Sequence, residues 1–295
     1  MGDKTLNRQN RIKIAENTLQ IIRDGQYISS SDIVQDIRHD LQHAIQNTCL
    51  YTPQMLEELL NNVPCQNNVS TQIHVRNQTT FAATCHLVVD QQCTNVACLN
   101  FASAKNPGGG FLGGSQAQEE SLSRASALYE TLLQAPSYYK TNRACGTCLY
   151  TDHMILSPEV PVFRNDDDEL LEESYNVSII TAPAVNAGAV MKNEPQRVSE
   201  IQQVMARRTA MLLALAASQN YRHLVLGAWG CGVFRSDPVM IAKLFAEQLT
   251  GNGHFANVFE SIVFAVLDRK DGKIIQAFED QLTPHQSSIH ETETT

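Results

Sequence analysis

The chain has 295 residues, of which 43% are hydrophobic and 18% charged, and its formal net charge is -9. This balance is ordinary for a globular protein, and the length allows one large domain with a substantial core. The acidic excess excludes a protein that holds nucleic acid by general neutralisation of phosphates. Its polar start and lack of long apolar runs predict neither a signal peptide nor a membrane span, so we expect a cytoplasmic location.

Residues 1–75 are predicted to form a helical extension that packs on the core. Apolar residues at helical spacing predict a helix over residues 7–24, which Gly25 ends. The same pattern predicts helices over residues 31–48 and 53–60. Residues 61–77 are rich in Asn and Gln, and we interpret them as the connection to the main domain.

From about residue 80, short apolar runs alternate with helical patterns. The runs are typical of buried strands and cover residues 85–90, 96–101, 176–184, 223–227 and 261–268. Amphipathic helices are predicted over 194–218 and 237–250. The apolar stripe of the second is Ile241, Leu244, Phe245 and Leu249. Alternating strands and helices predict a mainly parallel sheet with helices on both faces. This core is assigned to residues 76–280, and the polar tail, 281–295, is expected to be disordered.

The eight cysteines lie mostly inside apolar stretches, where Cys behaves as a small hydrophobic residue. They predict free thiols rather than a disulfide framework. Cys145 and Cys148 have the spacing of a metal or redox pair, but no second pair completes a zinc site. We interpret them as two thiols in a loop.

A glycine-rich loop follows the strand predicted over residues 96–101. Five of the seven residues from 108 to 114 are glycine, although glycine costs conformational entropy on folding. Between a strand and a helix, such a loop directs N–H groups toward an anion. A flexible hinge would have the same composition, so the glycines alone leave both interpretations open.

The residues after this loop are candidates for catalysis. Ser115 and Gln118 have the spacing of a capping box, which predicts a helix that begins at Ser115. Glu119 and Glu120 then lie in its first turns, beside whatever the glycines hold. Acidic residues are also common in a first turn because they favour the helix dipole, so spacing alone does not decide between the two roles.

A second glycine-containing loop, residues 227–236, follows the strand predicted over 223–227. In open α/β sheets, ligands bind at the carboxyl ends of the strands, so both loops are expected at one site. Trp229 and Phe234 either form a wall for a sugar or base or fill the end of the sheet. No Walker lysine follows either loop, which disfavours hydrolysis of nucleoside triphosphates.

Gly108-Gly109-Gly110, followed after seven residues by Gln118-Glu119-Glu120, resembles the signature of poly(ADP-ribose) glycohydrolases. Four further stretches are similar to the bacterial branch of that family: NFASAKNPGGGFLGG, YTDHMILSPEVPVFR, ITAPAVNAG and LGAWGCGVFRSDP. The resemblance implies a three-layer α/β/α macrodomain with a mixed, mainly parallel sheet and an N-terminal helical extension. It also implies a hydrolase that releases ADP-ribose from poly(ADP-ribose).

The resemblance assigns roles to individual residues. Glu120 corresponds to the acid that protonates the leaving ribose oxygen, and Glu119 to the residue that holds ribose hydroxyls. The residues expected to contact ADP-ribose are Asn106, Gly108, Gly109, Gly110, Gln118, Gly230, Cys231, Gly232, Val233 and Phe234. Phe234 would lie against the terminal ribose. No metal or cofactor is expected.

We weigh three functions other than cleavage of poly(ADP-ribose) against the same loops and side chains. A hydrolase of single ADP-ribose units on protein or nucleic acid would have the same pocket as one that acts on poly(ADP-ribose) or ADP-ribosylated protein. A binding module that does not cut is disfavoured, because two adjacent carboxylates beside a diphosphate have no use in binding. A thiol enzyme based on Cys231 and a histidine is disfavoured, because Cys231 lies between glycines whose amides suit phosphate.

The assignment of an acid next to a helix N-terminus raises an electrostatic question. The helix end lowers the pKa of a carboxyl group, whereas an acid catalyst must hold a proton near neutral pH. A neighbouring carboxylate and burial raise the pKa. The sequence does not show which effect is larger.

Overall fold

The computed structural model describes residues 7–63, 69–268 and 271–283, and its centre is a seven-stranded mixed sheet. The strand order is β3-β6-β7-β5-β8-β9-β4. The strands are β3 (Cys49–Tyr51), β4 (Gln72–Arg76), β5 (Val96–Phe101), β6 (Met154–Arg164), β7 (Leu170–Ala182), β8 (His223–Leu226) and β9 (Ser261–Ala265). The five strands from β7 to β4 are parallel, and β6 is antiparallel to both of its neighbours.

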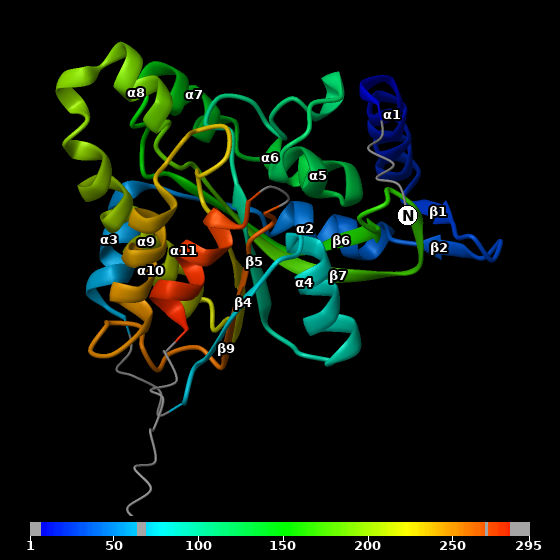
Figure 1. The fold of residues 1–295 in the computed structure, drawn as a ribbon. Helices are drawn as coiled ribbons and strands as arrows, with labels where there is room; N and C mark the ends of the chain where they lie inside the picture. The colour runs from blue at the N-terminus through cyan, green and yellow to red at the C-terminus, as the bar shows by residue number, and fades with distance from the viewer. Residues whose placement is uncertain (1–6, 64–68, 269–270, 284–295) are drawn as a thin grey trace, which may run out of the picture.

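Helices cover both faces of this sheet (Figure 1). One face is covered by α3 (Pro53–Asn61), α9 (Glu200–Ser218), α10 (Pro238–Leu249) and α11 (Lys273–Leu282). The other is covered by α2 (Arg38–Gln46), α4 (Thr80–Cys85) and α6 (Leu128–Leu132). Helix α7 (Pro136–Ala144) lies beside α8 (Ala187–Asn193) in Figure 1 and adds Tyr138 and Tyr139 to the same core. Because side chains alternate along a strand, Leu99 of β5 is buried in the first core and Cys98 in the second. The predicted three-layer α/β/α class is confirmed.

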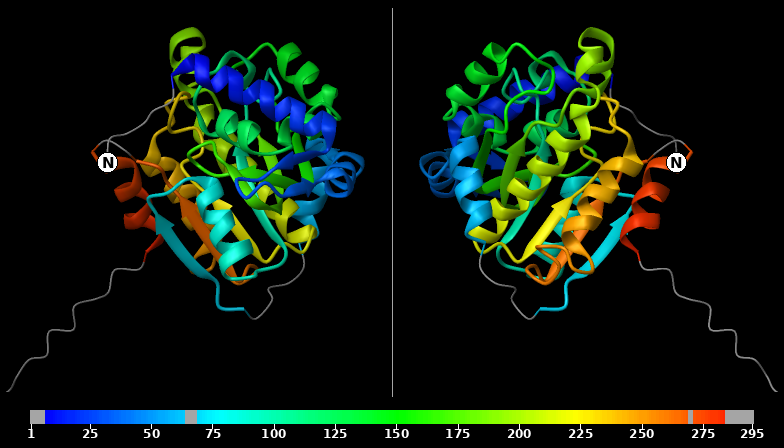
Figure 2. Two further views of the ribbon diagram at one scale, coloured as in Figure 1. Left: turned by 90° about the vertical axis from the view of Figure 1, so that its right-hand side faces the viewer. Right: turned by 90° about the vertical axis from the view of Figure 1, so that its left-hand side faces the viewer.

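Two further helices are placed at one end of the sheet. Helix α5 (Gln118–Ala125) lies near the carboxyl end of β5, and α8 (Ala187–Asn193) follows β7. Helix α1 (Arg8–Asp24), in dark blue in Figure 2, lies outside the sheet against the segment that carries α5. The loops around α5 and α1 therefore lie at the same end of the molecule.

The signals at helix ends predicted several elements well. Asn7 caps α1 by accepting from the N–H of Asn10, and Gly25 ends it in the left-handed conformation, with φ of 66°. Asp237 caps α10 by accepting from the N–H of Val239. The predicted apolar stripe of α10 is buried. These signals are local, so the surrounding fold does not change them.

Two predicted elements are wrong. The helix predicted over 31–48 begins only at Arg38, and Val34–Asp36 instead forms β2, which pairs with β1 (Gln26–Ile28). The strand predicted over 85–90 is the last residue of α4 and a π-helical turn over His86–Asp90. Short apolar runs do not distinguish a buried strand from a buried helical segment.

The predicted connection over 61–77 contains β4, which completes the sheet edge beside β9. The predicted boundary at residue 75 therefore falls inside β4, and the first 75 residues also contribute β3 to the sheet. Of the tail predicted over 281–295, residues 281 and 282 lie in α11, and residues from 284 lie outside the described part of the chain.

Strand β6 was missed because Pro158 and Pro161 interrupt its apolar pattern, and prolines are rare inside a sheet. The structure accommodates them with a register irregularity between Ser157 and Val160. None of the described helices is long and apolar enough to cross a membrane. The seven described cysteines are free, and Cys145 and Cys148 follow α7.

Candidate active site

The two predicted glycine loops meet at a cavity of about 780 Å³ at the carboxyl ends of β5 and β8. Both predicted catalytic residues, Glu119 and Glu120, line this cavity. The predicted ADP-ribose contacts that line it are Asn106, Gly109, Gly110, Gln118, Gly230, Cys231, Gly232, Val233 and Phe234. Gly108 is buried instead, and a β-carbon there would meet the side chains of Phe111 and Ser123.

Helix α5 begins at Gln118 rather than at Ser115, so the predicted capping box is wrong. Ala117 is the N-cap and makes no side-chain cap hydrogen bond. The amide of Gln118 instead reaches back to β5, where its Oε1 accepts from the N–H of Phe101 at 2.8 Å. Its Nε2 donates to the carbonyl of Leu99 at 2.7 Å. Gln118 thereby ties the start of α5 to the end of the strand.

Glu119 is buried, with 2% of its surface exposed. Its Oε2 accepts from the N–H of Ser103 at 2.6 Å, and its Oε1 accepts from Asn100 Nδ2 at 3.3 Å. Burial raises the pKa of Glu119 from 4.5 to about 8, although these hydrogen bonds lower it. For the Glu119 carboxyl group, the increase in pKa from burial is therefore larger than the decrease from its hydrogen bonds.

Glu120 is less buried than Glu119, and its Oε1 accepts from the N–H of Gly110 at 2.9 Å. Gly109 has φ of +60°, and a β-carbon there would overlap the Glu120 carboxylate and lie 3.2 Å from Glu119 Oε2. Any side chain at this position would therefore displace the carboxylates. Glycine is required at 109 because both carboxyl groups converge there.

The second loop presents different surfaces to the cavity. Gly230 has φ of +80°, and a β-carbon there would lie 2.7 Å from that of Ala184. Among the described residues, apart from the chain neighbours of Gly232, no atom lies within 4 Å of the corresponding position at Gly232, so that residue borders open space. The ring of Phe234 lies 6.2 Å, between centroids, from the ring of Tyr150, which also lines the cavity. Burial raises the pKa of Cys231 to about 12, so its thiol does not supply a nucleophilic thiolate at neutral pH.

Trp229 fills the end of the sheet. It is fully buried, and its indole N–H donates to the carbonyl of Ala182 at the end of β7 at 3.2 Å. Of the two alternatives for this side chain, a ligand wall or a plug, the structure shows the plug. Phe234 is the aromatic residue of this loop that borders the cavity.

Several lining residues were missed because they come from distant segments. Tyr150 precedes β6, Asp166 and Asp168 lie in the turn between β6 and β7, and Thr79 caps α4. The hydroxyl of Thr79 donates to Asp166 Oδ2 at 2.6 Å, which joins that turn to α4 at the cavity. The acidic run over 166–169 between two apolar segments is the signal that could have indicated this turn.

Comparisons with known proteins agree with this geometry. Residues 15–165 match the family model described as "Microbial-type PARG, catalytic domain". The chain is similar to the crystal structure of poly(ADP-ribose) glycohydrolase from Thermomonospora curvata, with 42% identity and a TM-score of 0.89, over 92% of this chain and 99% of that one. The same enzyme bound to the inhibitor ADP-HPD matches with 43% identity and a TM-score of 0.86, over the same shares of the two chains.

The chain is also similar to poly(ADP-ribose) glycohydrolase from Deinococcus radiodurans in complex with ADP-ribose. The identity is 45% and the TM-score 0.78, over 82% of this chain and 97% of that one. A comparison with curated proteins found no match. The family match, the shared fold and the paired glutamates beside the glycine loop lead to one conclusion. The chain belongs to the microbial-type poly(ADP-ribose) glycohydrolase family.

Proposed function

We propose that this protein hydrolyses the ribose–ribose O-glycosidic bonds of poly(ADP-ribose) and releases ADP-ribose, with Glu120 as the acid. The observation that carries this proposal is the convergence of two carboxyl groups on Gly109 in a cavity that both glycine loops line. The cavity, about 780 Å³, is in the usual range for small-molecule sites. Complexes of the relatives with ADP-HPD and ADP-ribose support the ligand class.

In the proposed mechanism, Glu120 gives its proton to the leaving ribose oxygen as the glycosidic C–O bond breaks. The sugar passes through an oxocarbenium-like state, and the diphosphate of the substrate helps to stabilise its positive charge. Water then attacks the anomeric carbon and loses a proton to Glu120, which restores the acid. The N–H of Gly110 fixes Oε1 of Glu120 and so orients the carboxyl group toward the cavity.

Glu119 is assigned to ribose binding. With its pKa near 8, it holds a proton over much of the neutral range, so the two adjacent side chains do not both carry a negative charge there. Its hydrogen bonds to Ser103 and Asn100 hold the carboxyl group still. A fixed group that both donates and accepts hydrogen bonds suits a pair of sugar hydroxyls.

The diphosphate is assigned to the two glycine loops. With a net charge of -9, the protein has no general basic field for an anion, so neutral N–H groups at loop and helix starts are the suitable donors. The open space at Gly232 leaves room for a phosphate beside the backbone. Phe234 and Tyr150 then provide an apolar border for the terminal ribose.

The test compares two substrates. The protein is incubated with automodified poly(ADP-ribosyl)ated protein and with a mono-ADP-ribosylated peptide, and the released ADP-ribose is measured by chromatography. We expect rapid release from the polymer and none from the peptide. Release from the peptide alone would assign the site to the mono-ADP-ribosyl hydrolases, and binding without release from either would make it a binding module.

A further inference from the structure

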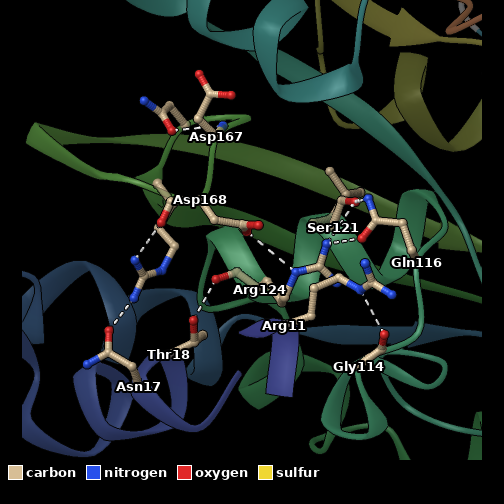
Figure 3. A network of polar contacts seen from close by, with 12 residues as sticks. Arg11, Asn17, Thr18, Gly114, Gln116, Ser121, Arg124, Asp167 and Asp168 are labelled. Carbon is tan, nitrogen blue, oxygen red and sulfur yellow. Dashed lines mark hydrogen bonds and ion pairs between the residues drawn. The ribbon is translucent and has the colours of Figure 1, made fainter. Parts of the chain in front are cut away.

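Helix α1 is bonded to the segment that joins the glycine loop to α5. Arg8 Nε donates to the carbonyl of Gly113 and Arg11 Nε to that of Gly114, each at 2.8 Å. One turn or more further along, the hydroxyl of Thr18 donates to the carbonyl of Arg124 in α5 at 2.6 Å. Figure 3 shows the contacts of Arg11 and Thr18. Helix α1 thus bonds the start of the connecting segment and the last turn of α5.

The backbone of α1 lies so close to the loop that only glycine fits at position 114. Gly114 has φ of +71°, which side chains rarely adopt. A β-carbon there would lie 2.5 Å from the carbonyl oxygen of Arg8 and 3.0 Å from Cγ1 of Ile12. This glycine therefore serves the docking of α1, whereas Gly109 serves the carboxyl groups.

The buried side chain of Arg124 bonds the connecting segment between the glycine loop and α5 (Figure 3). Arg124 lies one turn after Glu120 and is 2% exposed. Its Nη1 donates to the carbonyl of Ser115 at 3.1 Å, its Nη2 also bonds Gln116, and its Nε pairs with Asp168 Oδ1 at 3.4 Å. One guanidinium thereby links the loop, α5 and the turn between β6 and β7.

Arg164, the last residue of β6, bonds both α1 and the turn between β6 and β7. Arg164 donates to the carbonyl of Asp168 at 2.9 Å and to the side chain of Asn17. Asp168, the partner of Arg124, is therefore linked to the N-terminal helix through Arg164. Arg124 lines the cavity, whereas Arg8 and Arg11 do not, so the hydrogen bonds of Arg8 and Arg11 to Gly113 and Gly114 act on the loop.

The position of Glu120 depends on this segment in two ways. The N–H that holds Oε1 of Glu120 belongs to Gly110, which lies in the loop, and the Glu120 backbone belongs to α5. Movement of residues 113–116 would change the position of the Gly110 N–H relative to the backbone of Glu120 in α5. We propose that Arg8 and Arg11 of α1 are positioning residues that aim the Glu120 carboxyl group at the bond to be broken. This inference rests on the proposed role of Glu120.

The test removes the two surface arginines and keeps the total charge matched. The double variant Arg8→Met/Arg11→Met, which leaves no side-chain donor at either position, is compared with Lys13→Met/Arg23→Met, which changes two exposed cations of the same helix. Arg23 donates to Gln20 within that helix. We expect kcat to fall about 10-fold or more relative to the control, because misplacing a reacting group by about 1 Å can cost about 100-fold in rate. KM should change less than about 3-fold.

A conservative pair and a buried variant complete the design. Arg8→Lys/Arg11→Lys keeps a positively charged group with N–H donors at each position and should recover part of the kcat lost in the Met pair. Thr18→Val removes one hydrogen bond at nearly constant shape and should also lower kcat, with circular dichroism confirming that each variant is folded. Equal kcat in the Met pair and its control, or a loss confined to KM, would overturn the positioning role.

A parallel assay of Glu120→Gln separates this inference from the proposed function. If Glu120→Gln is active, the assignment of the acid is wrong and the inference falls with it. If Glu120→Gln is inactive while the arginine pair retains the kcat of its control, the acid stands and only the positioning role is wrong.

Discussion

Adjacent residues of α5, Glu119 and Glu120, have carboxyl groups in different surroundings. Glu119 is buried and accepts hydrogen bonds from Ser103 and Asn100, and burial raises its pKa to about 8. Glu120 accepts from Gly110, and both carboxyl groups converge on Gly109. This difference in environment is consistent with the different roles that we propose for the two side chains.

At this scale, Glu120→Gln is expected to bind ADP-ribose but not to cleave polymer. The amide keeps the shape of the side chain and can still accept from Gly110, but it has no proton to give. We expect the rate of ADP-ribose release to fall at least about 100-fold, a usual contribution of general acid catalysis. Calorimetry should give an ADP-ribose affinity within about 3-fold of the parent. Glu16→Gln, an exposed change on α1, is the control, and a rate near the parent value would disprove the assignment.

Glu119→Gln is expected to change how stability depends on pH. The folded protein holds a proton on Glu119 up to about pH 8, whereas the unfolded chain releases it near 4.5. The free energy of unfolding contributed by this group is therefore fully present below about pH 4.5 and is lost as the pH rises to about 8. Glu119→Gln has no titrating carboxyl group at this position, so its free energy of unfolding does not decrease in this way. Its stability relative to the parent should be greater at pH 8 than at pH 5.

Urea denaturation at the two pH values measures this difference. The new amide can bond Asn100 once the amide of Asn100 rotates, because Asn100 Oδ1 has no partner among the described residues. Glu16→Gln again serves as the control, since that side chain is exposed. Parallel pH profiles for parent and Glu119→Gln would contradict the raised pKa.

At the scale of elements, the second glycine-containing loop, residues 227–236, is held in place at both of its ends. Trp229 bonds the end of β7, and Asp237 caps α10, so both ends of the loop are anchored. Between them, Gly232 borders open space, and we propose that the loop approaches a phosphate there. Apart from its chain neighbours, a β-carbon added at Gly232 would meet no atom of the described residues within 4 Å. Substitution should therefore affect the ligand more than the fold.

We expect Gly232→Ala to weaken ADP-ribose binding and Gly232→Val to weaken it further, because the larger side chain takes more of the space assigned to phosphate. Loss in Gly232→Val of at least about 10-fold in affinity corresponds to about 1.4 kcal/mol. Calorimetry measures the affinities, and thermal unfolding should place both variants close to the parent. Normal binding by Gly232→Val would exclude this loop as a phosphate cradle.

At the scale of the whole molecule, the net charge of -9 opposes the binding of an anion from a distance. Affinity must then come from short-range donors inside the cavity, which salt screens much less than exposed charges. A protein that binds nucleic acid by neutralising many phosphates with Lys and Arg loses about 1,000-fold or more in affinity between 50 and 200 mM salt. This protein is expected to behave differently.

The affinity for ADP-ribose should change less than about 3-fold over that salt range, since neutral N–H groups release no counterions. Calorimetry at the two salt concentrations measures this directly. A steep fall in affinity would show that exposed cations bind the ligand and would contradict the assignment of the diphosphate to the glycine loops.

The sequence by itself determined the elements with local signals. The caps at Asn7, Gly25 and Asp237 are set by neighbouring backbone groups, so α1 and α10 were predicted almost to the residue. The apolar run of β5 and its following glycines indicated a ligand loop at a strand end. The spacing of Gly108–Gly110 and Gln118–Glu120 indicated the family, because it depends on residue types and on distance along the chain.

The tertiary structure decided the roles of side chains within those motifs. Gly109 and Gly114 look alike in the sequence, but one makes room for carboxyl groups and the other for the backbone of α1, which lies about 100 residues earlier. Burial of Glu119, the plug formed by Trp229 and the guanidinium links of Arg124 all depend on segments that fold together from distant positions. Such contacts have no local pattern, because they arise from packing and not from the order of neighbouring residues.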